Sequence, residues 1–478
     1  MKVLFLNPIH TGKSFSINTI GRGLITSYLS CPAVTFTQLA AYIHEMDIDI
    51  IDGHVENISL NQFHKKLQGV DSVAISIHSS FEARDCEENI RFIKKQYPKI
   101  KIIMGGYHAS FFYKRWLAIG VDFVVLYEGD ECFKELMVCL QEGKSYACIK
   151  NLAFKEKDKV VVNEIRPLIE NLDSLPVPRY DLIDFTRYFA FFPGDGFAGG
   201  IEISRGCPDR CDFCLTSKYW NERYRRKSNE RILKELEMLH EKNIRKLWFY
   251  TSSFGIDFKK DYELCDLIIK RRLNISWRTS IRVDTVLKFP ELIKKAAESG
   301  LMLVLIGYES VAQSVLLSNK MRNSLYSFVN YKKAYRLLKK NRIVVDGSFI
   351  VGLSDAADEM GNLSCRKLSQ ICDHLILQIC RPNIATVHDI LEKKPSDDDY
   401  KKLFYFYPNI SHDVKIKKSM SIKRKIEYNY YLNPVYIYRK FFFSGRLVRR
   451  LCFYEYRYLI KGFLKYITRK CIDLFIES

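Results

Sequence analysis

The sequence predicts an α/β protein: a doubly wound parallel sheet, then a full or partial β/α barrel, then a mostly helical C-terminal region. Two patterns lead to this fold class. Short β-branched apolar runs alternate with helical stretches over the first ~150 residues, and the alternation resumes after the middle of the chain in units of about 25–35 residues. The chain has 478 residues, too many for one ordinary core. Its hydrophobic fraction of 47% and charged fraction of 27% indicate a folded globular protein.

The first unit, residues 1–145, is expected to form the doubly wound sheet. Ligands of such sheets bind at the carboxyl ends of the strands. At one of these ends, Gly105 and Gly106 allow the backbone to approach a large flat or phosphate-bearing ligand closely. The predicted strands are Lys2–Asn7, Ile48–Asp52, Ser72–Ser76, Ile100–Gly105 and Phe123–Tyr127, and the predicted helices are Phe36–Glu45, Leu60–Gln68, Cys86–Tyr97 and Glu131–Gln141.

Residues 146–195 are expected to connect the first unit to the second. Charged residues between apolar pairs suggest a hairpin around Lys155–Lys159. The segment Leu175-Pro176-Val177-Pro178-Arg179 predicts an extended linker, because the residue before a proline disfavours the helical conformation.

The second unit, residues 196–385, is expected to be the barrel, whose active site lies at the carboxyl ends of its strands. Ser280 and Arg282 follow one strand, Glu309 and Ser310 the next, and Gly352 the last. Arg282 offers a fixed cationic fork for a carboxylate, and Glu309 an acceptor for hydroxyl groups. The predicted strands are Lys246–Tyr250, Ser276–Ser280, Met302–Ile306 and Val344–Val351, and the predicted helices are Ser228–Glu241, Asp261–Arg271, Pro290–Ser299 and Ser324–Lys340.

Three cysteines within eight residues, Cys207, Cys211 and Cys214, are the strongest chemical signal in the chain. Thiolates gathered on a loop with Gly and Pro favour an iron–sulfur cluster or zinc. Structural zinc takes four ligands, and no second cysteine pair or Cys/His knuckle lies nearby. Three thiolates instead leave one iron of a four-iron cluster open. The remaining 11 of the 14 cysteines lack metal-ligand spacing, and we expect structural or incidental roles for them.

The spacing Cys-x3-Cys-x2-Cys, with an aromatic residue before the last cysteine, resembles the radical S-adenosylmethionine (radical SAM) superfamily. The resemblance implies a six-unit partial (β/α)6 barrel, a [4Fe-4S] cluster on the three cysteines and S-adenosylmethionine at the open iron. It also implies that S-adenosylmethionine is bound by the residues that match the family's Ser-x-Arg, Gly-x-Glu-Ser and Phe-Ile-x-Gly-Leu elements, which are Ser280, Arg282, Glu309, Ser310 and Gly352.

One motif departs from the family pattern. Relatives usually have Phe-x-Asp-Asp-x-Phe after the strand that follows the cluster, whereas this chain has Phe249-Tyr250-Thr251-Ser252-Ser253-Phe254. Hydroxyl groups such as that of Ser252 can hydrogen-bond the ammonium group of S-adenosylmethionine but supply no charge. The affinity or the pose of this cofactor is therefore expected to differ.

The first unit resembles the Rossmann-like cobalamin-binding domain that precedes many radical SAM cores. The resemblance rests on Asp52, on Gly-Gly-x-His after the fourth strand and on Tyr-Glu-Gly-Asp-Glu after the fifth. His54 is interpreted as a surface-loop histidine and not as a cobalt ligand, because it follows the second strand and residue 57 is Asn where cobalamin mutases have Gly. The implied cobalamin-binding residues are Gly105, Gly106, His108, Glu128 and Gly129.

The C-terminal region, residues 386–478, is expected to be helical, basic and aromatic. Residues 414–478 hold 16 Lys and Arg and 4 Asp and Glu, and therefore +12 of the formal net charge of +20. Such helices can pack on the barrel, lie on an anionic membrane or a lipid-like substrate, or bind nucleic acid; packing is favoured and nucleic acid is unlikely. No apolar run approaches ~20 residues, and no signal-peptide segment follows Met1. A cytoplasmic location is expected, with peripheral membrane association as an alternative.

Together these patterns predict a cobalamin-dependent radical SAM enzyme that cleaves S-adenosylmethionine reductively to a 5′-deoxyadenosyl radical. Methylation of an unactivated carbon is the first hypothesis. Two alternatives stay open: cyclisation or ring rearrangement by the same radical, and a cobalamin or redox sensor that no longer cleaves S-adenosylmethionine. The expected partners are a small-molecule or lipid-like substrate and an electron donor such as flavodoxin or ferredoxin.

Overall fold

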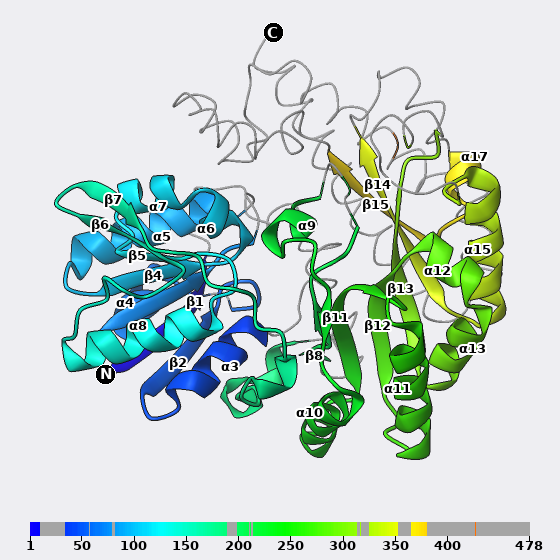
Figure 1. Cartoon of the computed structure of the whole chain (residues 1–478), viewed down its shortest axis with the longest axis horizontal. Coiled ribbons are helices and arrows are strands. Elements are labelled where there is room, and N and C mark those ends of the chain that lie inside the picture. Colours follow the sequence, from blue (N-terminus) through cyan, green and yellow to red (C-terminus); the bar gives the residue numbers. More distant parts are fainter. Residues whose placement is uncertain are drawn as a thin grey trace, which may run out of the picture.

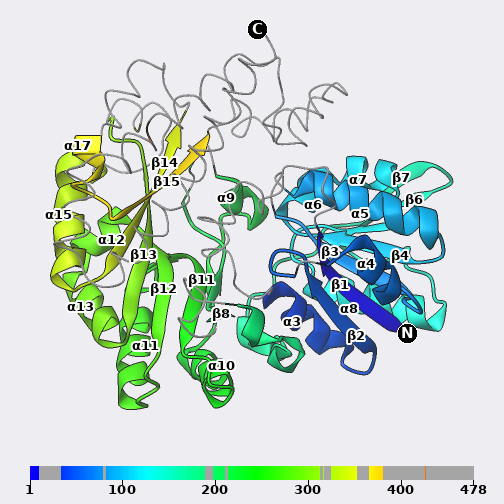
Figure 2. The same cartoon turned by 180° about the vertical axis from the view of Figure 1, so that it is seen from behind.

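Two α/β units lie side by side in the computed structural model (Figures 1 and 2), the first in blue and cyan and the second in green and yellow. The structure describes residues 1–9, 34–56, 58–78, 82–188, 198–209, 211, 214–312, 316, 325–351, 365–379 and 426. Gly352 and all of residues 386–478 except Ile426 lie outside the described residues, so the expectations for them stay predictions.

The first unit is built on a seven-stranded sheet with the order β2-β1-β3-β4-β5-β6-β7. Strands β1 to β5 pair in parallel. Their bounds are Lys2–Asn7 (β1), Asp47–Asp52 (β2), Ser72–Ser76 (β3), Lys101–Gly105 (β4) and Phe123–Val125 (β5). The doubly wound sheet predicted from the apolar runs is therefore confirmed.

Helices cover both faces of this sheet. Alternate residues of β1 belong to different hydrophobic clusters, Leu4 and Leu6 to one and Val3 and Phe5 to the other, because successive side chains of a strand point to opposite faces. The helices are α3 (Val34–Ala40), α4 (Leu60–Lys66), α5 (Ala83–Gln96), α6 (Tyr107–Phe111), α7 (Tyr113–Ile119) and α8 (Asp130–Glu142), and a short 3-10 turn, Ala41–Ile43, follows α3.

The hairpin expected in the connector belongs to the first sheet. Strands β6 (Leu152–Glu156) and β7 (Lys159–Val162) pair antiparallel, and β6 pairs antiparallel with β5. The first unit thus extends beyond residue 145, the boundary expected from the sequence. The rest of the connector is irregular, with 3-10 turns at Leu172–Ser174, Tyr180–Leu182 and Phe185–Arg187.

The second unit is a six-stranded parallel sheet with the order β15-β14-β13-β12-β11-β8. Its helices lie along the outer side of the curved sheet, as in a partial barrel (Figure 1). The strands are Ala198–Glu202 (β8), Lys246–Phe254 (β11), Ser276–Ile281 (β12), Leu301–Glu309 (β13), Val344–Val351 (β14) and His374–Ile379 (β15). The helices are α10 (Asn229–Glu241), α11 (Phe258–Lys270), α12 (Val283–Lys288), α13 (Pro290–Glu298), α15 (Phe328–Lys340) and α17 (Cys365–Leu368).

The barrel core lies between the strands and these helices. Phe249 of β11 stacks on Trp277 of β12, with ring centroids 4.5 Å apart, and both rings are fully buried. Within the described residues, no helix has both the length and the apolar character needed to cross a bilayer.

Candidate active site

The three cysteines lie on a hairpin that two short antiparallel strands close, β9 (Ser204–Arg205) and β10 (Arg225–Arg226). We call residues 204–226 the cysteine hairpin. Gly206 opens its loop with a φ of +82°, and a Cβ atom there would collide with the carbonyl oxygen of Arg223. Helix α9 (Leu215–Tyr219) begins directly after Cys214.

Cys207, Cys211 and Cys214 form no disulfide within the described residues; Cys211 is buried and the other two are half-buried. The backbone N–H of Cys214 donates to the carbonyl oxygen of Cys211 at 3.0 Å. Among the residues that the structure describes, no three metal-binding side chains already converge. The fit to a [4Fe-4S] cluster therefore rests on the donor set, because three cysteine thiols on one short loop are soft ligands that suit iron–sulfur clusters.

Arg282, at the end of β12, contacts the cysteine loop directly. Its Nε and Nη2 donate to the two carboxylate oxygens of Asp284, each at 2.8 Å. Its Nη1 forms an ion pair with Asp209, which lies between the first two cysteines. The guanidinium expected to hold the carboxylate of S-adenosylmethionine thus already contacts two carboxylates, and a third would have to displace one of them or share the cation.

Glu309 and Ser310 lie at the end of β13, beside β12. Glu309 is buried and has a φ of +62°, at a register shift between β13 and β14. A non-glycine residue in this left-handed region is strained, and such strain is concentrated at functional sites. The Ser310 hydroxyl accepts the backbone N–H of Ala312 at 3.1 Å. Ser280 is half-buried near the end of β12, so these three residues lie at neighbouring strand ends, as predicted.

The segment that replaces the acidic pair is the last part of β11, which runs through Phe254. Thr251 accepts a hydrogen bond from the hydroxyl of Ser204 at 2.6 Å, and Ser252 is exposed. The hydroxyl of Ser253 is buried without a hydrogen-bond partner in the described part of the chain. The structure thus provides hydroxyl groups and no carboxylate at these three positions.

In the first unit, Gly105 ends β4 and Gly106 has a φ of +98°, where a Cβ atom would lie 2.5 Å from the carbonyl oxygen of Ile77. His108, expected to bind cobalamin, is instead a core residue. Its ring is 4% exposed, packs on Phe112, and its Nδ1 accepts a hydrogen bond from Trp116 Nε1 at 3.2 Å. It lies inside α6, and its neighbours bury it.

His54 lies at the carboxyl end of β2 and forms ion pairs with Glu82 at 3.2 Å and Asp52 at 3.5 Å. Burial alone would lower the pKa of His54, but Glu82 and Asp52 raise it to about 9. The imidazole is therefore charged at neutral pH and offers no lone pair to a metal. It is a paired group and not the simple surface-loop histidine expected from the sequence.

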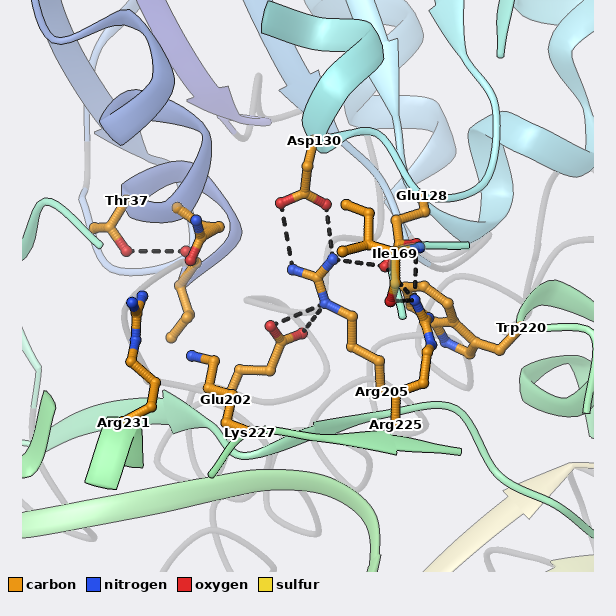
Figure 3. Close-up of polar contacts among 12 residues, drawn as sticks. Thr37, Glu128, Asp130, Ile169, Glu202, Arg205, Trp220, Arg225, Lys227 and Arg231 are labelled. Carbon is orange, nitrogen blue, oxygen red and sulfur yellow. Dashed lines mark hydrogen bonds and ion pairs between the residues drawn. The ribbon is translucent and has the colours of Figure 1, made fainter. Parts of the chain in front are cut away.

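A buried ion-pair network joins the cysteine hairpin to the first unit (Figure 3). Arg205 Nη1 donates to Glu128 at 2.8 Å and to Asp130 at 2.7 Å, and its Nε donates to Glu202 at 3.0 Å. Arg225 Nη1 donates to Glu128 at 2.9 Å. Burial by itself would lower the pKa of Arg205, but Asp130, Glu202 and Glu128 raise it well above its usual value. Glu128, expected to bind cobalamin, contacts arginines, and Gly129 begins α8 beside it.

Aromatic residues around α9 form a second contact between the units. Trp220 Nε1 donates to the hydroxyl of Tyr107 at 2.7 Å, and the rings of Tyr107 and Tyr219 lie 4.1 Å apart. The hydroxyl of Tyr219 donates to the backbone carbonyl of Tyr127. Since Tyr107 follows Gly105 and Gly106, the cysteine hairpin lies against the strand ends where cobalamin was expected.

Sequence reasoning missed Arg205, Arg225, Asp130 and Trp220. The sequence around Arg205 gives little signal of burial, because Glu202 and Ser204 precede it and Gly206 follows it; once buried, its charge requires a partner. The partner could not be identified, because Glu128 and Asp130 are more than 70 positions away in the chain.

Comparisons with known proteins agree with this arrangement. A family model described as the B12 binding domain matches residues 23–137, and one described as the Radical SAM superfamily matches residues 201–362. An uncharacterized methyltransferase of Pyrococcus horikoshii is 32% identical over 367 residues, which are 75% of this chain and 76% of that protein. The chain belongs to the cobalamin-binding radical SAM family.

Another relative of this radical SAM protein is an anaerobic magnesium-protoporphyrin IX monomethyl ester cyclase of Rubrivivax gelatinosus, 27% identical over 377 residues, 75% of this chain and 64% of that protein. Among solved structures, one similar fold is that of TsrM from Kitasatospora setae, a radical S-adenosylmethionine methyltransferase with cobalamin and a [4Fe-4S] cluster bound. The TM-score is 0.62 at 15% identity, and the match covers 79% of this chain and 72% of that chain. The cobalamin-dependent radical enzyme OxsB has a TM-score of 0.61 at 19% identity, over 82% of this chain and 55% of that chain.

The fold of this radical SAM protein is therefore that of a cobalamin-binding domain followed by a radical SAM barrel. Its family uses a [4Fe-4S] cluster, S-adenosylmethionine and cobalamin. Enzymes of the superfamily act on small molecules and need a reductant. The relatives include proteins named methyltransferases and proteins named cyclases.

Proposed function

We propose that this enzyme methylates an unactivated carbon of a small molecule. The observation that carries the proposal is the position of the cysteine hairpin, whose Trp220 and Tyr219 contact Tyr107 and Tyr127 at the strand ends of the cobalamin-binding domain. A hairpin in this position would bring the radical-generating group close to a methyl carrier. When bound, cobalamin supplies methyl-transfer chemistry and the cluster supplies the electron that cleaves S-adenosylmethionine.

The residues proposed for the two cofactor sites lie on the cysteine hairpin and at the strand ends of both units. Cys207, Cys211 and Cys214 would hold the cluster. Ser280, Glu309 and Ser310, at the ends of β12 and β13, would contact S-adenosylmethionine, together with Ser252, which is exposed at the end of β11. Gly105 and Gly106 would line the cobalamin side, since they lie at the carboxyl end of β4, next to Tyr107, which the cysteine hairpin contacts.

A radical cyclisation or ring rearrangement is the second candidate, supported by the relatives named as cyclases. The sensor hypothesis is supported by the hydroxyl groups of Thr251, Ser252 and Ser253, which give the ammonium group of S-adenosylmethionine no counter-charge.

The products of S-adenosylmethionine separate these candidates. Protein purified without oxygen would be reconstituted with iron, sulfide and cobalamin, and given S-adenosylmethionine with a deuterated methyl group and a chemical reductant. Methyl transfer requires S-adenosylhomocysteine in addition to 5′-deoxyadenosine, both measured by mass spectrometry. A cyclase would form 5′-deoxyadenosine without S-adenosylhomocysteine, and a sensor would form neither.

Two cysteine variants control this experiment. Cys211→Ala removes a proposed cluster ligand and is expected to abolish 5′-deoxyadenosine. Cys148→Ala removes an exposed free thiol of the first unit and is expected to leave the products unchanged. An equal loss of 5′-deoxyadenosine in both variants would contradict the assignment of the cluster to the cysteine hairpin.

The proposal extends to the partners. A flavodoxin or ferredoxin would supply electrons, and the basic segment 414–478, with its net charge of +12, would pack on the barrel or contact an anionic membrane or a lipid-like substrate. Sedimentation with vesicles of anionic and of neutral phospholipid tests the membrane contact, which requires binding to the anionic vesicles alone.

A further inference from the structure

We infer that Arg205 is a positioning residue for the iron–sulfur cluster, and that Glu128 and Asp130 of the cobalamin-binding domain act on the cysteine hairpin through it. The inference assigns these two acidic residues to the cluster side of the interface and not to cobalamin. It rests on family membership and on the network of Figure 3, and it holds for methylation and for cyclisation alike.

The connection between Arg205 and the cysteine loop is short. Arg205 pairs with Arg225 across β9 and β10, and this pair closes the base of the loop that holds all three cysteines. Only Gly206 separates Arg205 from Cys207, and Gly206 is held tightly against the backbone of Arg223. Because the loop has this rigid base, a shift of Arg205 must move the first cysteine.

The contacts of Arg205 engage most of its guanidinium. Nη1 bridges Glu128 at 2.8 Å and Asp130 at 2.7 Å, Nη2 donates to Asp130 at 3.4 Å, and Nε donates to both oxygens of Glu202 at 3.1 and 3.0 Å. The Arg205 side chain is 7% exposed, and those of Glu128 and Asp130 are 3% and 7% exposed. Charges this deeply buried need each other, so the hairpin has one strongly preferred position.

Glu128 also joins the second strand of the hairpin to the first unit. It accepts Arg225 Nη1 at 2.9 Å and the backbone N–H of Ile169 at 2.7 Å. The ring of Trp220 lies beside both guanidinium groups, with centroid distances of 5.9 Å to Arg205 and 5.2 Å to Arg225. Both strands of the hairpin are thus held by the loop between β5 and α8.

The same burial argues against direct contact of Glu128 and Asp130 with cobalamin. Their oxygen atoms already accept hydrogen bonds from arginines and from the backbone, and little of either side chain reaches the surface. If either carboxylate bound cobalamin directly, replacing it by the neutral amide would weaken cobalamin binding. If it positions the hairpin, the same substitution would destabilise the iron–sulfur cluster instead.

The test therefore measures the two cofactors separately in the reconstituted full-length protein. The variants are Asp130→Asn, Glu128→Gln and Arg205→Lys, and the control is Glu135→Gln, which removes an ion pair between the same helix α8 and Arg166 that includes no residue of the cysteine hairpin. Readouts are the rate of iron loss to a chelator, the electron paramagnetic resonance spectrum of the reduced cluster, and the cobalamin that co-elutes on gel filtration.

We expect Asp130→Asn to lose iron about tenfold faster than wild type and to broaden the spectrum of the cluster, as substitutions of outer residues around metal sites do. Arg205→Lys keeps the charge but loses the fork of donors, so its rate of iron loss should lie between those of wild type and Asp130→Asn. Retained cobalamin is expected to stay within about twofold of wild type in all variants. Glu135→Gln should match wild type in every readout.

Loss of cobalamin from Asp130→Asn with an unchanged cluster would overturn the inference, as would unchanged iron loss in all three variants. If Asp130→Asn or Glu128→Gln does not fold, the test relies on Arg205→Lys, because that variant keeps the charge of the network. An unchanged cluster spectrum and an unchanged rate of iron loss in Arg205→Lys would also overturn the inference. None of these readouts requires turnover, so a failure of the proposed methyl transfer leaves the test intact.

Discussion

At the residue scale, a few side chains and one glycine determine the geometry of the cysteine hairpin. Gly206 has a φ of +82° and lies against Arg223, whereas Arg282 contacts the middle of the loop through Asp209. His54 and Glu82 form a half-buried ion pair at the carboxyl end of β2. Each of these residues makes a local prediction.

Substitution Gly206→Ala is expected to destabilise the protein by about 1–3 kcal/mol, because alanine is strained at positive φ and its Cβ would collide with the backbone of Arg223. Chemical denaturation measures this loss, and iron uptake should fall with it. Gly143→Ala is the control, because Gly143 has a φ of +65° but no atom within 4 Å of a Cβ. Equal effects of the two substitutions would show that the collision is unimportant.

Substitution His54→Gln is expected to have a pH-dependent cost. The pKa of His54 is raised in the folded protein to about 9, so the charged imidazole stabilises the fold fully below about pH 6.5, and this stabilisation is lost as the pH rises through about 9. The difference in unfolding free energy between wild type and variant, measured by denaturation from pH 6 to pH 10, should shrink with rising pH. A constant difference would contradict the ion pair; the exposed His44→Gln is the control.

At the scale of elements, helix α10 attaches the interdomain linker to the barrel. Its Glu235 is fully buried and accepts Lys227 Nζ at 2.7 Å, Arg231 Nε at 2.7 Å and the hydroxyl of Tyr180, in the linker, at 3.1 Å. Arg231 Nη2 also donates to the carbonyl oxygen of Pro176 at 2.7 Å. The extended linker predicted from its prolines is thus held by α10.

Substitution Glu235→Gln should lower the free energy of unfolding by about 3–5 kcal/mol, since it leaves the buried cations of Lys227 and Arg231 without their carboxylate. The control on the same helix is Glu237→Gln, whose ion pair with Arg271 is exposed and is worth less than about 1 kcal/mol. Urea denaturation of both variants measures the difference. Similar losses would mean that the buried network contributes no more than a surface pair.

Most elements were predictable because their signal is local. Strand β14 (Val344–Val351) has the predicted bounds, as do β1 and β3, since apolar residues make up most of each segment. The β6–β7 hairpin was predicted, but its membership of the first sheet was not, because that depends on pairing with β5, about 30 positions earlier in the chain. Likewise β11 continues through Thr251, Ser252 and Ser253 into Phe254, where polar residues end the apolar pattern.

At the scale of the whole molecule, contacts among the described residues join the two units at several places. The Arg205 network and the Trp220–Tyr107 contact join the cysteine hairpin to the first unit, and Tyr188 in the linker donates to Asp52 at 2.8 Å. Because it contains buried charges and aromatic contacts, the interface between the two units resembles a domain core more than a transient interface. The two units are therefore expected to unfold together.

Calorimetry of the reconstituted protein should give one unfolding transition for wild type and two for Arg205→Met, because this substitution removes the cation that joins Glu128 and Asp130 to the hairpin. Arg166→Met removes an ion pair with Glu135 inside the first unit and should keep a single transition. Two transitions in wild type would contradict the expected coupling.

The sequence by itself determined the fold class and the order of the units and predicted the cysteine ligands, because hydrophobic periodicity and the spacing of thiols are local properties that survive without a partner. The tertiary structure decided which side chains the strand-end residues contact. Glu128 and Arg282 form ion pairs with residues distant in the chain, and His108 is enclosed in its helix pair. A buried charge is stabilised by whichever opposite charge the fold brings to it, and that partner cannot be inferred from neighbours in the sequence.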